Sequence, residues 1–200
     1  MRVIAGRFKS RVLDAPAGLA TRPTSDRLRE ALFNVLAPRM EGARVLDLYA
    51  GSGAVGLEAV SRGAREAVMV ERDEAALKAL RANVARLGVA AACRIHASGV
   101  AAWLRRGRTK AAEFDVVFLD PPYEADEEYA TALGLLGTQE GLLARGAVVV
   151  AEHRKQKMLE ERYGGLRRTR VLKQGDAALS FYGLEDETCA ADESELDASL

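Results

Sequence analysis

The stretch ARVLDLYAGSGAVGLEA, residues 43–59, decides the fold. Its apolar residues predict a buried strand from Arg44 to Tyr49, and the glycines that follow predict a tight turn. The small and apolar residues after the turn predict a helix, for which Gly63 is a suitable C-terminal cap. A strand, a glycine turn and a helix in this order form the first unit of a parallel α/β sheet.

The rest of the chain repeats this alternation of strands and helices. A helix with an apolar stripe follows the second strand and stops at Gly88, a short helix runs through Trp103, and a helical stretch covers 129–143. Further strands are expected in EAVMVE (66–71), ACRIHA (92–97), FDVVFLD (114–120) and GAVVVAE (146–152). This pattern predicts a doubly wound, mostly parallel α/β sheet, which binds its ligands at the carboxyl ends of the strands.

The composition indicates a single folded domain with an uneven distribution of charge. The 200 residues are 48% hydrophobic, and no apolar run approaches the roughly 20 residues of a membrane span, so we expect no membrane contact. Cys93 and Cys189 are far apart without metal-type spacing, which favours a reduced, cytoplasmic protein. The net charge of zero conceals an acidic tail, because residues 185–200 carry seven acids and no base, against 29 bases and 22 acids in residues 1–184. Since the tail also lacks aromatic residues, we expect it to be disordered.

The basic residues gather in two clusters, which predict contact with a polyanion. Residues 1–44 contain nine bases and four acids, and residues 153–173 contain eight bases and two acids. An ordinary solvated surface is the alternative interpretation of such clusters. The acidic tail either competes with the polyanion for these bases or improves solubility, and we favour solubility.

The first two predicted strands end in residues suited to a cofactor that contains a nucleoside. A GxGxxG pattern starts at Gly51, and Glu71 follows twenty residues later, where a carboxylate can bind both hydroxyls of a ribose. Nicotinamide dinucleotides and S-adenosylmethionine both satisfy this pattern. Asp47, just before the glycines, favours S-adenosylmethionine because its carboxylate can bind the cationic amino-acid part of that cofactor.

The fourth strand ends in a turn that carries an acid and an aromatic ring, Asp120-Pro121-Pro122-Tyr123. Two consecutive prolines remove two backbone donors and fix φ, so the turn is stiff. The exocyclic amine of a nucleobase is a poor nucleophile because its lone pair is delocalised into the ring. A carboxylate and a proline-fixed carbonyl can accept its two hydrogens and stabilise the developing positive charge, while the aromatic ring stacks on the base. A polar turn with a tyrosine at the core edge is the structural alternative.

DPPY, together with the upstream VLDLYAGSGAVGLEA, resembles the amino-methyltransferases that act on nucleic-acid bases. MRVIAGRFKSR and RPTSDRLREALFNVLAP narrow the resemblance, over about residues 1–184, to the RsmD-type enzymes, which methylate guanine N2 in 16S ribosomal RNA. It implies a class I S-adenosylmethionine-dependent methyltransferase fold, with a Rossmann-like, seven-stranded, mostly parallel sheet whose last strand is antiparallel, and a small N-terminal β-hairpin. LRRTRVLKQGDAALSFYGL fits the closing hairpin, with Gly175 and Asp176 at its turn.

The resemblance also implies roles for individual residues. The expected cofactor ligands are Asp47, Tyr49, Gly51, Ser52, Gly53, Glu71, Arg72 and Ser98. Ser98 stands where related enzymes place an acid or an amide for the adenine amino group, so the chain departs from the family pattern there. The residues expected to handle the target amine and its base are Asp120, Pro121, Pro122 and Tyr123.

The N-terminal 40 residues are expected to form an RNA-contacting extension of a catalytic domain that covers 41–184. RPTSDRLREALFNVL has the apolar stripe of a helix capped by Thr24 or Ser25. The basic hairpin before it resembles a grip on the RNA backbone, although charge that protects an edge hairpin from aggregation would look similar. The residues expected to contact RNA are Arg2, Arg7, Lys9, Arg11, Arg22, Thr24 and Arg27.

These observations predict a monomeric, metal-free enzyme that uses S-adenosylmethionine to methylate guanine N2 in ribosomal RNA, either naked or within an assembling small subunit. The first alternative is an adenine-N6 methyltransferase on DNA or RNA, because DPPY serves both reactions. Against it, the chain has no room for a separate DNA target-recognition domain. The second alternative is a dinucleotide-binding or RNA-binding module without catalysis.

Overall fold

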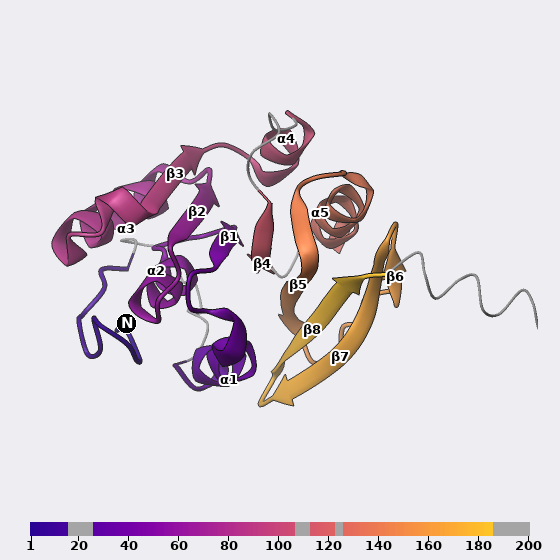
Figure 1. Cartoon of the computed structure of the whole chain (residues 1–200), viewed down its shortest axis with the longest axis horizontal. Helices are drawn as coiled ribbons and strands as arrows, with labels where there is room; N and C mark the ends of the chain where they lie inside the picture. The colour runs from indigo at the N-terminus through magenta and orange to yellow at the C-terminus, as the bar shows by residue number, and fades with distance from the viewer. Residues whose placement is uncertain (16–25, 107–112, 123–125, 186–200) are drawn as a thin grey trace, which may run out of the picture.

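The computed structural model describes residues 1–15, 26–106, 113–122 and 126–185 of the chain. Five α-helices and eight strands lie within these residues (Figure 1). The helices are α1 (Asp26–Leu36), α2 (Ala54–Ser61), α3 (Glu74–Leu87), α4 (Val100–Arg105) and α5 (Asp126–Thr138). The strands are β1 (Arg44–Leu48), β2 (Glu66–Glu71), β3 (Cys93–Ala97), β4 (Phe114–Leu119), β5 (Leu143–Arg154), β6 (Arg162–Tyr163), β7 (Leu166–Gln174) and β8 (Ala177–Leu184).

The strands form one sheet in the order β3-β2-β1-β4-β5-β8-β7-β6. Strands β1 to β5 run parallel, and β8 runs antiparallel to β5, as the resemblance to class I methyltransferases implies. The seven expected strands are present, and the eighth, β6, is a two-residue addition that pairs with β7. The chain passes from β7 to β8 through Gly175, whose φ of +60° fits the expected turn.

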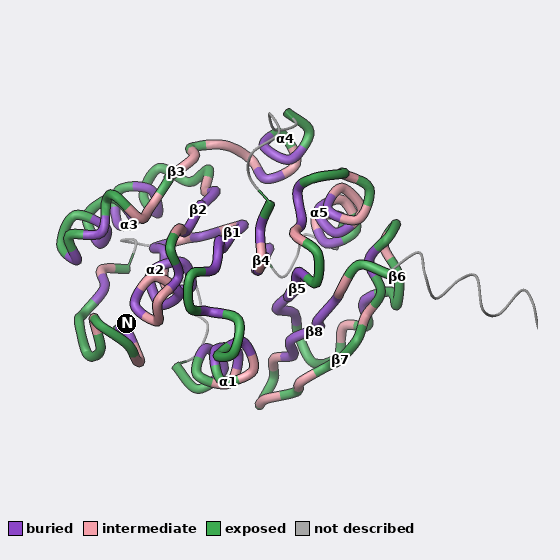
Figure 2. The backbone as a smooth tube through the Cα atoms, in the orientation of Figure 1, coloured by how far each residue is buried: buried purple, intermediate pink, exposed green. Residues whose placement is uncertain are grey.

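Helices cover both faces of the sheet (Figure 1). Helices α4 and α5 pack on one face with Trp103 and Leu133, and α1, α2 and α3 pack on the other with Leu32, Leu57 and Leu80. Strand β1, which lies between β2 and β4, is buried along its whole length (Figure 2). The residues of a parallel strand covered on both faces form a nearly continuous apolar run, which explains the VLDL pattern of residues 45–48.

Helix α1 belongs to the same core as the sheet. Leu32 and Phe33 pack in one cluster with Val45 of β1 and Val116 of β4. The expected boundary near residue 40 therefore does not coincide with a break in packing. Arg29, which the apolar stripe did not include, is also fully buried on this helix.

Three element boundaries differ from the sequence expectation. The helix expected at 129–143 is α5, which ends at Thr138, and the chain then turns at Gly141 with φ of +71°. Strand β5 extends to Arg154 because its second half pairs with β8. Strand β1 ends one residue early because Tyr49 takes a left-handed φ of +63°.

The first 14 residues form a hairpin-shaped segment, in which only Arg2 and Val12 make a β-bridge. Its main anchor is the buried carboxylate of Glu58 in α2, which accepts the backbone amides of Ile4 at 2.7 Å and Ala5 at 2.9 Å. The expected N-terminal hairpin is thus present with very little ladder of its own. Contacts to α2, and further ones to α1 and α3, hold it in place.

The substitution Glu58→Ala should destabilise the fold. It leaves the amides of Ile4 and Ala5, and the guanidinium of Arg62 that donates to the same carboxylate at 2.7 Å, without their acceptor. Breaking a buried ion pair costs about 3–5 kcal/mol, and urea unfolding should show a loss of that size in the unfolding free energy. The control Glu30→Ala, at an exposed position of α1, should change it by less than about 0.5 kcal/mol. A loss below about 1 kcal/mol for Glu58→Ala would contradict the anchoring role.

Candidate active site

The loop between β1 and α2 turns through residues with left-handed backbone. Tyr49, Gly51 and Gly53 have φ of +63°, +55° and +84°. A Cβ atom at Gly53 would lie 2.3 Å from Leu80 Cδ1 of α3, so backbone conformation and packing both require glycine there. A loop without bulky side chains lets a ligand approach the backbone closely.

A buried amide of α3 joins this loop to the N-terminal segment. Asn83 Nδ2 donates to the carbonyl of Ser52 at 3.0 Å and to that of Asp14 at 3.0 Å, while its Oδ1 accepts the Asp14 amide at 2.8 Å. Sequence reasoning missed Asn83, because nothing in the periodicity of α3 separates it from a core position. Its contacts fix the loop position of Ser52, one of the expected cofactor ligands.

Asp47 lies at the end of β1, where its side chain is almost fully buried, with 2% exposure. Its Oδ2 accepts the amide of Gly56, in the first turn of α2, at 2.9 Å. Burial raises the pKa of Asp47 to about 7, the Gly56 amide opposes this rise, and the charge of Glu71 adds to it. A cationic group bound beside Asp47 would therefore remove an electrostatic cost that the protein carries by itself.

Glu71 ends β2 and ties the glycine loop to the next turn. Its Oε2 accepts the amide of Gly51 at 2.8 Å, and its Oε1 accepts the amides of Arg72 at 2.7 Å and Asp73 at 2.8 Å. A carboxylate offers about four acceptor positions, and backbone amides occupy three, so the residue fits a ribose hydroxyl at Oε2. Asp73 also caps α3 by accepting the Ala76 amide at 2.8 Å.

The remaining expected cofactor residues surround the same strand ends. Burial and the neighbouring Glu128 carboxylate raise the pKa of the Tyr49 hydroxyl. Arg72 Nη2 lies 3.7 Å from Glu128 Oε1, so α5 reaches this group of side chains. Ser98 follows β3, is half-buried, and donates its amide to the Glu71 carbonyl at 2.9 Å. The sequence alone did not indicate a role for Glu128, because it lies in a short acidic run, EADEE.

Asp120 directly follows β4, and β4 pairs with β1 in parallel. Asp120 and Asp47 therefore both lie at the carboxyl ends of these strands. The residue is half-buried. Burial of its carboxyl group, then the charges of Glu152 and Asp47, raise its pKa well above the usual value. Pro121 is buried and Pro122 is exposed, while Tyr123 lies outside the described residues. The structure therefore brings the acid of this turn to the cofactor residues.

The structure describes five of the seven residues that are expected to contact RNA. Arg22 and Thr24 lie outside the described residues. The other five are exposed: Arg2, Arg7, Lys9, Arg11 and Arg27. Arg2 is 3.5 Å from Asp26, and the Arg7 guanidinium stacks 5.2 Å from the centre of the Phe8 ring. Beneath them, Arg29 donates to the Arg2 carbonyl at 2.6 Å.

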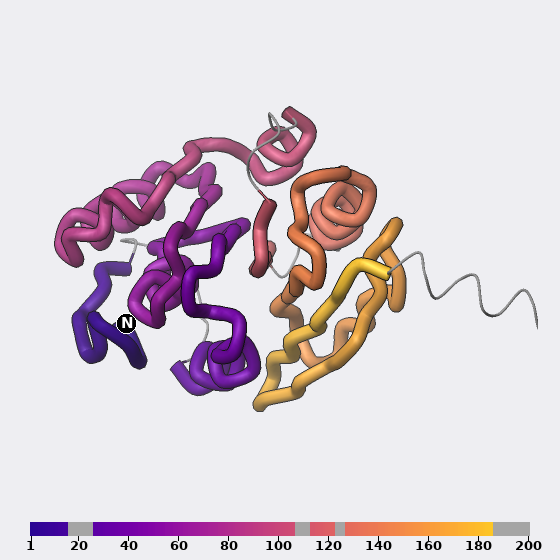
Figure 3. Tube along the Cα trace, viewed as in Figure 1, coloured from indigo at the N-terminus to yellow at the C-terminus, as the bar shows by residue number. Residues whose placement is uncertain are grey.

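The second basic cluster runs from the end of β5 through β6 and β7. Strand β6 lies on the far side of the molecule from the N-terminal segment (Figure 3), whereas Leu172 of β7 packs in one cluster with α1, which carries bases of the first cluster. Arg162 and Arg167 are paired with Glu185, at 2.8 Å and 3.6 Å. Most of the expected acidic tail, residues 186–200, lies outside the described residues.

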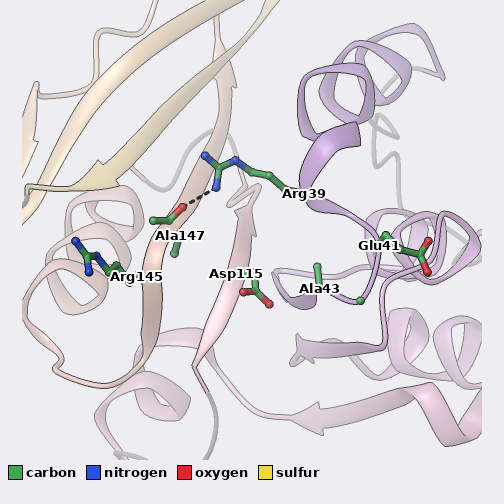
Figure 4. Close-up of a pocket in the computed structure, with 8 residues that line it drawn as sticks. Arg39, Glu41, Ala43, Asp115, Arg145 and Ala147 are labelled. Atoms are coloured by element: carbon green, nitrogen blue, oxygen red, sulfur yellow. Dashed lines mark hydrogen bonds between the residues drawn. The ribbon is translucent and has the colours of Figure 1, made fainter.

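A cavity of about 230 Å³ opens at the opposite ends of the strands, near the amino ends of β1, β4 and β5 (Figure 4). Two of its charged side chains make hydrogen bonds within the protein: Arg39 Nη1 donates to the Gly146 carbonyl at 2.7 Å, and Asp115 Oδ2 accepts the Arg44 amide at 2.7 Å. None of the expected cofactor residues lines it. Ligands of doubly wound sheets bind at the carboxyl ends, so this cavity is separate from the candidate active site.

With this geometry established, sequence comparison assigns the chain to a family. The model of the family described as Conserved hypothetical protein 95 matches residues 1–183. The chain belongs to this family. The match confirms the resemblance to the RsmD-type enzymes that the motifs indicated.

Individual relatives agree with this assignment. The chain is 36% identical over 182 residues to the putative rRNA methyltransferase YlbH of Bacillus subtilis, covering 91% of this chain and 98% of that protein. It is 40% identical over 123 residues to ribosomal RNA small subunit methyltransferase D of Escherichia coli K12, covering 62% of this chain and 60% of that protein. The solved structure of the putative methyltransferase yhhF from Escherichia coli superposes with a TM-score of 0.79 at 36% identity, covering 92% and 98%. The class I methyltransferase fold is thereby confirmed.

The described residues contain neither a candidate metal site nor a candidate membrane span. No group of three His, Cys, Asp or Glu side chains among them is arranged to hold a metal ion. In the same parts of the chain, every helix falls short of the length and apolar character that a membrane span requires.

Cofactor affinity should depend on the ionisation of Asp47. Because its pKa is raised to about 7 and a cationic ligand requires the ionised form, the affinity for S-adenosylmethionine should rise about tenfold per pH unit between pH 5 and 6 and level off above pH 7. Calorimetric titration of the cofactor at several pH values measures this. Asp47→Asn should bind more weakly and lose the pH dependence. Parent affinity that is flat from pH 5 to 8 would contradict the role.

Proposed function

We propose that this protein is an S-adenosylmethionine-dependent methyltransferase that methylates the exocyclic N2 amine of a guanine in small-subunit ribosomal RNA. The observation that carries the proposal is the convergence of Asp47, Glu71 and Asp120 at the carboxyl ends of β1, β2 and β4. The names of the relatives from Bacillus subtilis and Escherichia coli support ribosomal RNA as the substrate class.

The surroundings of each cofactor residue favour a particular role in binding S-adenosylmethionine. S-adenosylmethionine supplies an activated methyl group on a sulfonium. Asp47 faces the positive amino-acid end, because its buried carboxylate has a raised pKa and no basic group in the described parts of the chain offsets that rise. Glu71 accepts a ribose hydroxyl, and the backbone of the Gly51–Gly53 loop approaches the cofactor closely. Ser98 and the neighbouring backbone take the position of the adenine amino group.

Asp120 and the Pro121 carbonyl accept the two hydrogens of the target amine and keep its nitrogen directed at the methyl group. Tyr123, which completes the motif, stacks on the base. A base inside a duplex cannot reach the site at the carboxyl ends of the strands, so the target nucleotide is extruded from its stack. Direct transfer needs no covalent enzyme intermediate.

The exposed bases of the N-terminal segment hold the RNA backbone, together with Arg22 and Thr24. The substrate is ribosomal RNA, naked or within an assembling small subunit, and the enzyme acts in the cytoplasm as a monomer without a metal ion. The two basic clusters approach each other where the β7–β8 hairpin packs beside α1, so one RNA can contact bases of both there.

Asp120→Ala should lower the rate of methyl transfer much more than it lowers cofactor affinity. If the carboxylate stabilises charge that develops only in the transition state, kcat should fall by roughly 10²–10³, or about 2.7–4 kcal/mol. Asp120→Asn should be milder, because its amide oxygen still accepts a hydrogen bond. Single-turnover transfer of labelled methyl to 16S ribosomal RNA, followed by nucleoside analysis, provides the measurement.

The product identifies the substrate amine in the same experiment. The parent enzyme should yield N2-methylguanosine, whereas N6-methyladenosine would favour the adenine-specific alternative. No transfer to any nucleic acid, with NAD bound in place of S-adenosylmethionine, would support a binding module instead. An Asp120→Ala enzyme with nearly the parent rate would remove the amine-handling role.

Reversing the charges of Arg7, Lys9 and Arg11 to Glu should weaken RNA binding and leave cofactor affinity unchanged. Each lost contact to single-stranded phosphate should reduce the log–log salt slope by about 0.7. Fluorescence anisotropy with labelled RNA at several salt concentrations measures both quantities.

A matched control reverses three exposed bases outside both clusters: Lys78, Arg81 and Arg105. It changes the net charge equally and should affect affinity and salt slope much less. Equal effects in the two triple variants would mean that net charge alone, rather than the N-terminal segment, governs RNA binding.

A further inference from the structure

Strands β7 and β8 form a hairpin (Figure 1), and its tip lies at the same end of the sheet as the candidate active site. Strand β5 runs parallel to β4, with Ala151 opposite Leu119. It continues to Arg154, which is therefore two residues, or about 7 Å, beyond the level of Asp120. Arg154 pairs with Ala177, the first residue of β8, so the turn from β7 to β8 lies at this end of the sheet.

The tip and the adjoining half of β7 carry exposed bases. Lys155, which follows β5, and Arg170 and Lys173 of β7 are exposed, and none of these three tip bases forms an ion pair in the described parts of the chain. The Lys155 amide donates to the Asp176 carbonyl at 2.8 Å, which fixes its backbone against the turn. Asp176 is the only acid in residues 163–184, against four bases. The tip therefore presents an excess of positive charge to solvent.

The bases at the other end of the hairpin are engaged within the protein. Arg162 Nη1 lies 2.8 Å from Glu185 Oε2, and Arg167 Nη1 lies 3.6 Å from Glu185 Oε1. One carboxylate thus offsets part of the charge of these two arginines, and no such acid accompanies the tip bases. The second basic cluster therefore divides into a partly neutralised end at β6 and a tip that is available to an outside anion.

An irregularity in β7 separates the two arginines that stand on either side of Thr169. Arg168 is opposite Tyr182. Arg170 is opposite Phe181, so Thr169 is an extra residue, as in a β-bulge. Because opposite residues share a face of the sheet, the two arginines leave different faces. Arg168 Nη1 donates to a backbone carbonyl at 2.7 Å, whereas the Arg170 guanidinium lies 6.0 Å from the centre of the Phe181 ring, on the face that α1 covers.

We propose that the three tip bases, Lys155, Arg170 and Lys173, bind phosphates of the RNA strand that flanks the target nucleotide. The proposal rests on the function stated above. Strand β7 is three strands from β4, so the backbone of Lys173 is about 15 Å from that of Asp120 at the usual strand spacing. One strand of a nucleic-acid duplex advances about 3.4 Å per nucleotide, so the contacted phosphates lie within about five nucleotides of the target.

These contacts complement those of the N-terminal segment. Leu172, between two of the tip bases, packs against the cluster that contains α1, and the first turn of α1 carries the exposed Arg27. A strand held at both places is fixed on the two sides of the extruded base. Phosphate contacts carry no sequence information, but they set the register of the RNA on the protein. The tip thereby determines which nucleotide of the bound strand reaches Asp120.

The double variant Arg170→Gln/Lys173→Gln tests the proposal against a matched control, Arg162→Gln/Arg167→Gln, which removes the same charge from the other end of the hairpin. Fluorescence anisotropy uses a labelled fragment of 16S ribosomal RNA that contains the guanine methylated by the parent. Loss of two phosphate contacts should reduce the log–log salt slope by about 1.4 and the affinity at 0.1 M salt by about 10- to 30-fold. The control should stay within about threefold of the parent, and calorimetry should show unchanged cofactor affinity in both.

Neutral methylphosphonates in place of single phosphates locate the contact. Replacing a contacted phosphate should weaken parent binding by about fivefold at 0.1 M salt, and the same replacement should have little effect on the Arg170→Gln/Lys173→Gln variant. The phosphates that behave in this way should lie within about five nucleotides of the methylated guanine.

Three results would overturn the proposal. The first is an equal loss of affinity in the two double variants, because net charge would then account for it. The second is a set of sensitive phosphates that is the same in the parent and in the Arg170→Gln/Lys173→Gln variant. The third is weaker binding of that variant to assembled small subunits with unchanged binding to the RNA fragment, which would indicate a protein contact. Nucleoside analysis of RNA treated with the parent tests the function itself, so its failure is distinct from these results.

Discussion

The hydrogen bond from the Gly56 amide to the Asp47 carboxylate, 2.9 Å long, joins the end of the central strand β1 to the first turn of α2. Its geometry requires the absence of a side chain at Gly56, where a Cβ atom would lie 2.7 Å from Met69 Sδ and 3.3 Å from Asp47 Oδ2. The glycine loop spans the short distance between the two bonded residues. An amide near the start of a helix stabilises a negative charge, so α2 makes a buried carboxylate at this position tolerable.

The acids at the strand ends serve the proposed function but reduce the stability of the protein without its ligands. Asp47 and Asp120 both have raised pKa values, which means that the folded protein without ligands holds their negative charges at a cost. A cationic cofactor relieves this cost at Asp47, and an amine that becomes positive relieves it at Asp120. The spacing of the two acids follows from the parallel register of β1 and β4, which is set by apolar packing far from the chemistry. The sheet therefore provides the preorganised charge, and the loops complete the site.

Local patterns in the sequence determined much of this account. The apolar runs of 43–59 and 114–120, the glycine turn and Gly175 each act within a few residues, so strands, turns and the acids at strand ends could be predicted. The buried Arg29 and Asn83 could not, because each bonds to backbone of distant segments, at Arg2 and Ser52. Glu152 carried the same signal as Asp120, an acid after an apolar strand, but only the register with β4 shows that the two are neighbours. The end of α5 was misplaced because Leu142 and Leu143 continue an apolar pattern into β5.

The central claim is that acids at the carboxyl ends of neighbouring strands bind both the cofactor and the target amine. A crystal structure of the protein with S-adenosylhomocysteine and a guanosine-containing RNA fragment tests it most directly. The account predicts the cofactor ammonium beside Asp47, its ribose on Glu71, and the guanine N2 atom within hydrogen-bonding distance of Asp120 and the Pro121 carbonyl. A cofactor bound at this edge with the base held elsewhere, or with a different atom of the base turned toward Asp120, would contradict it.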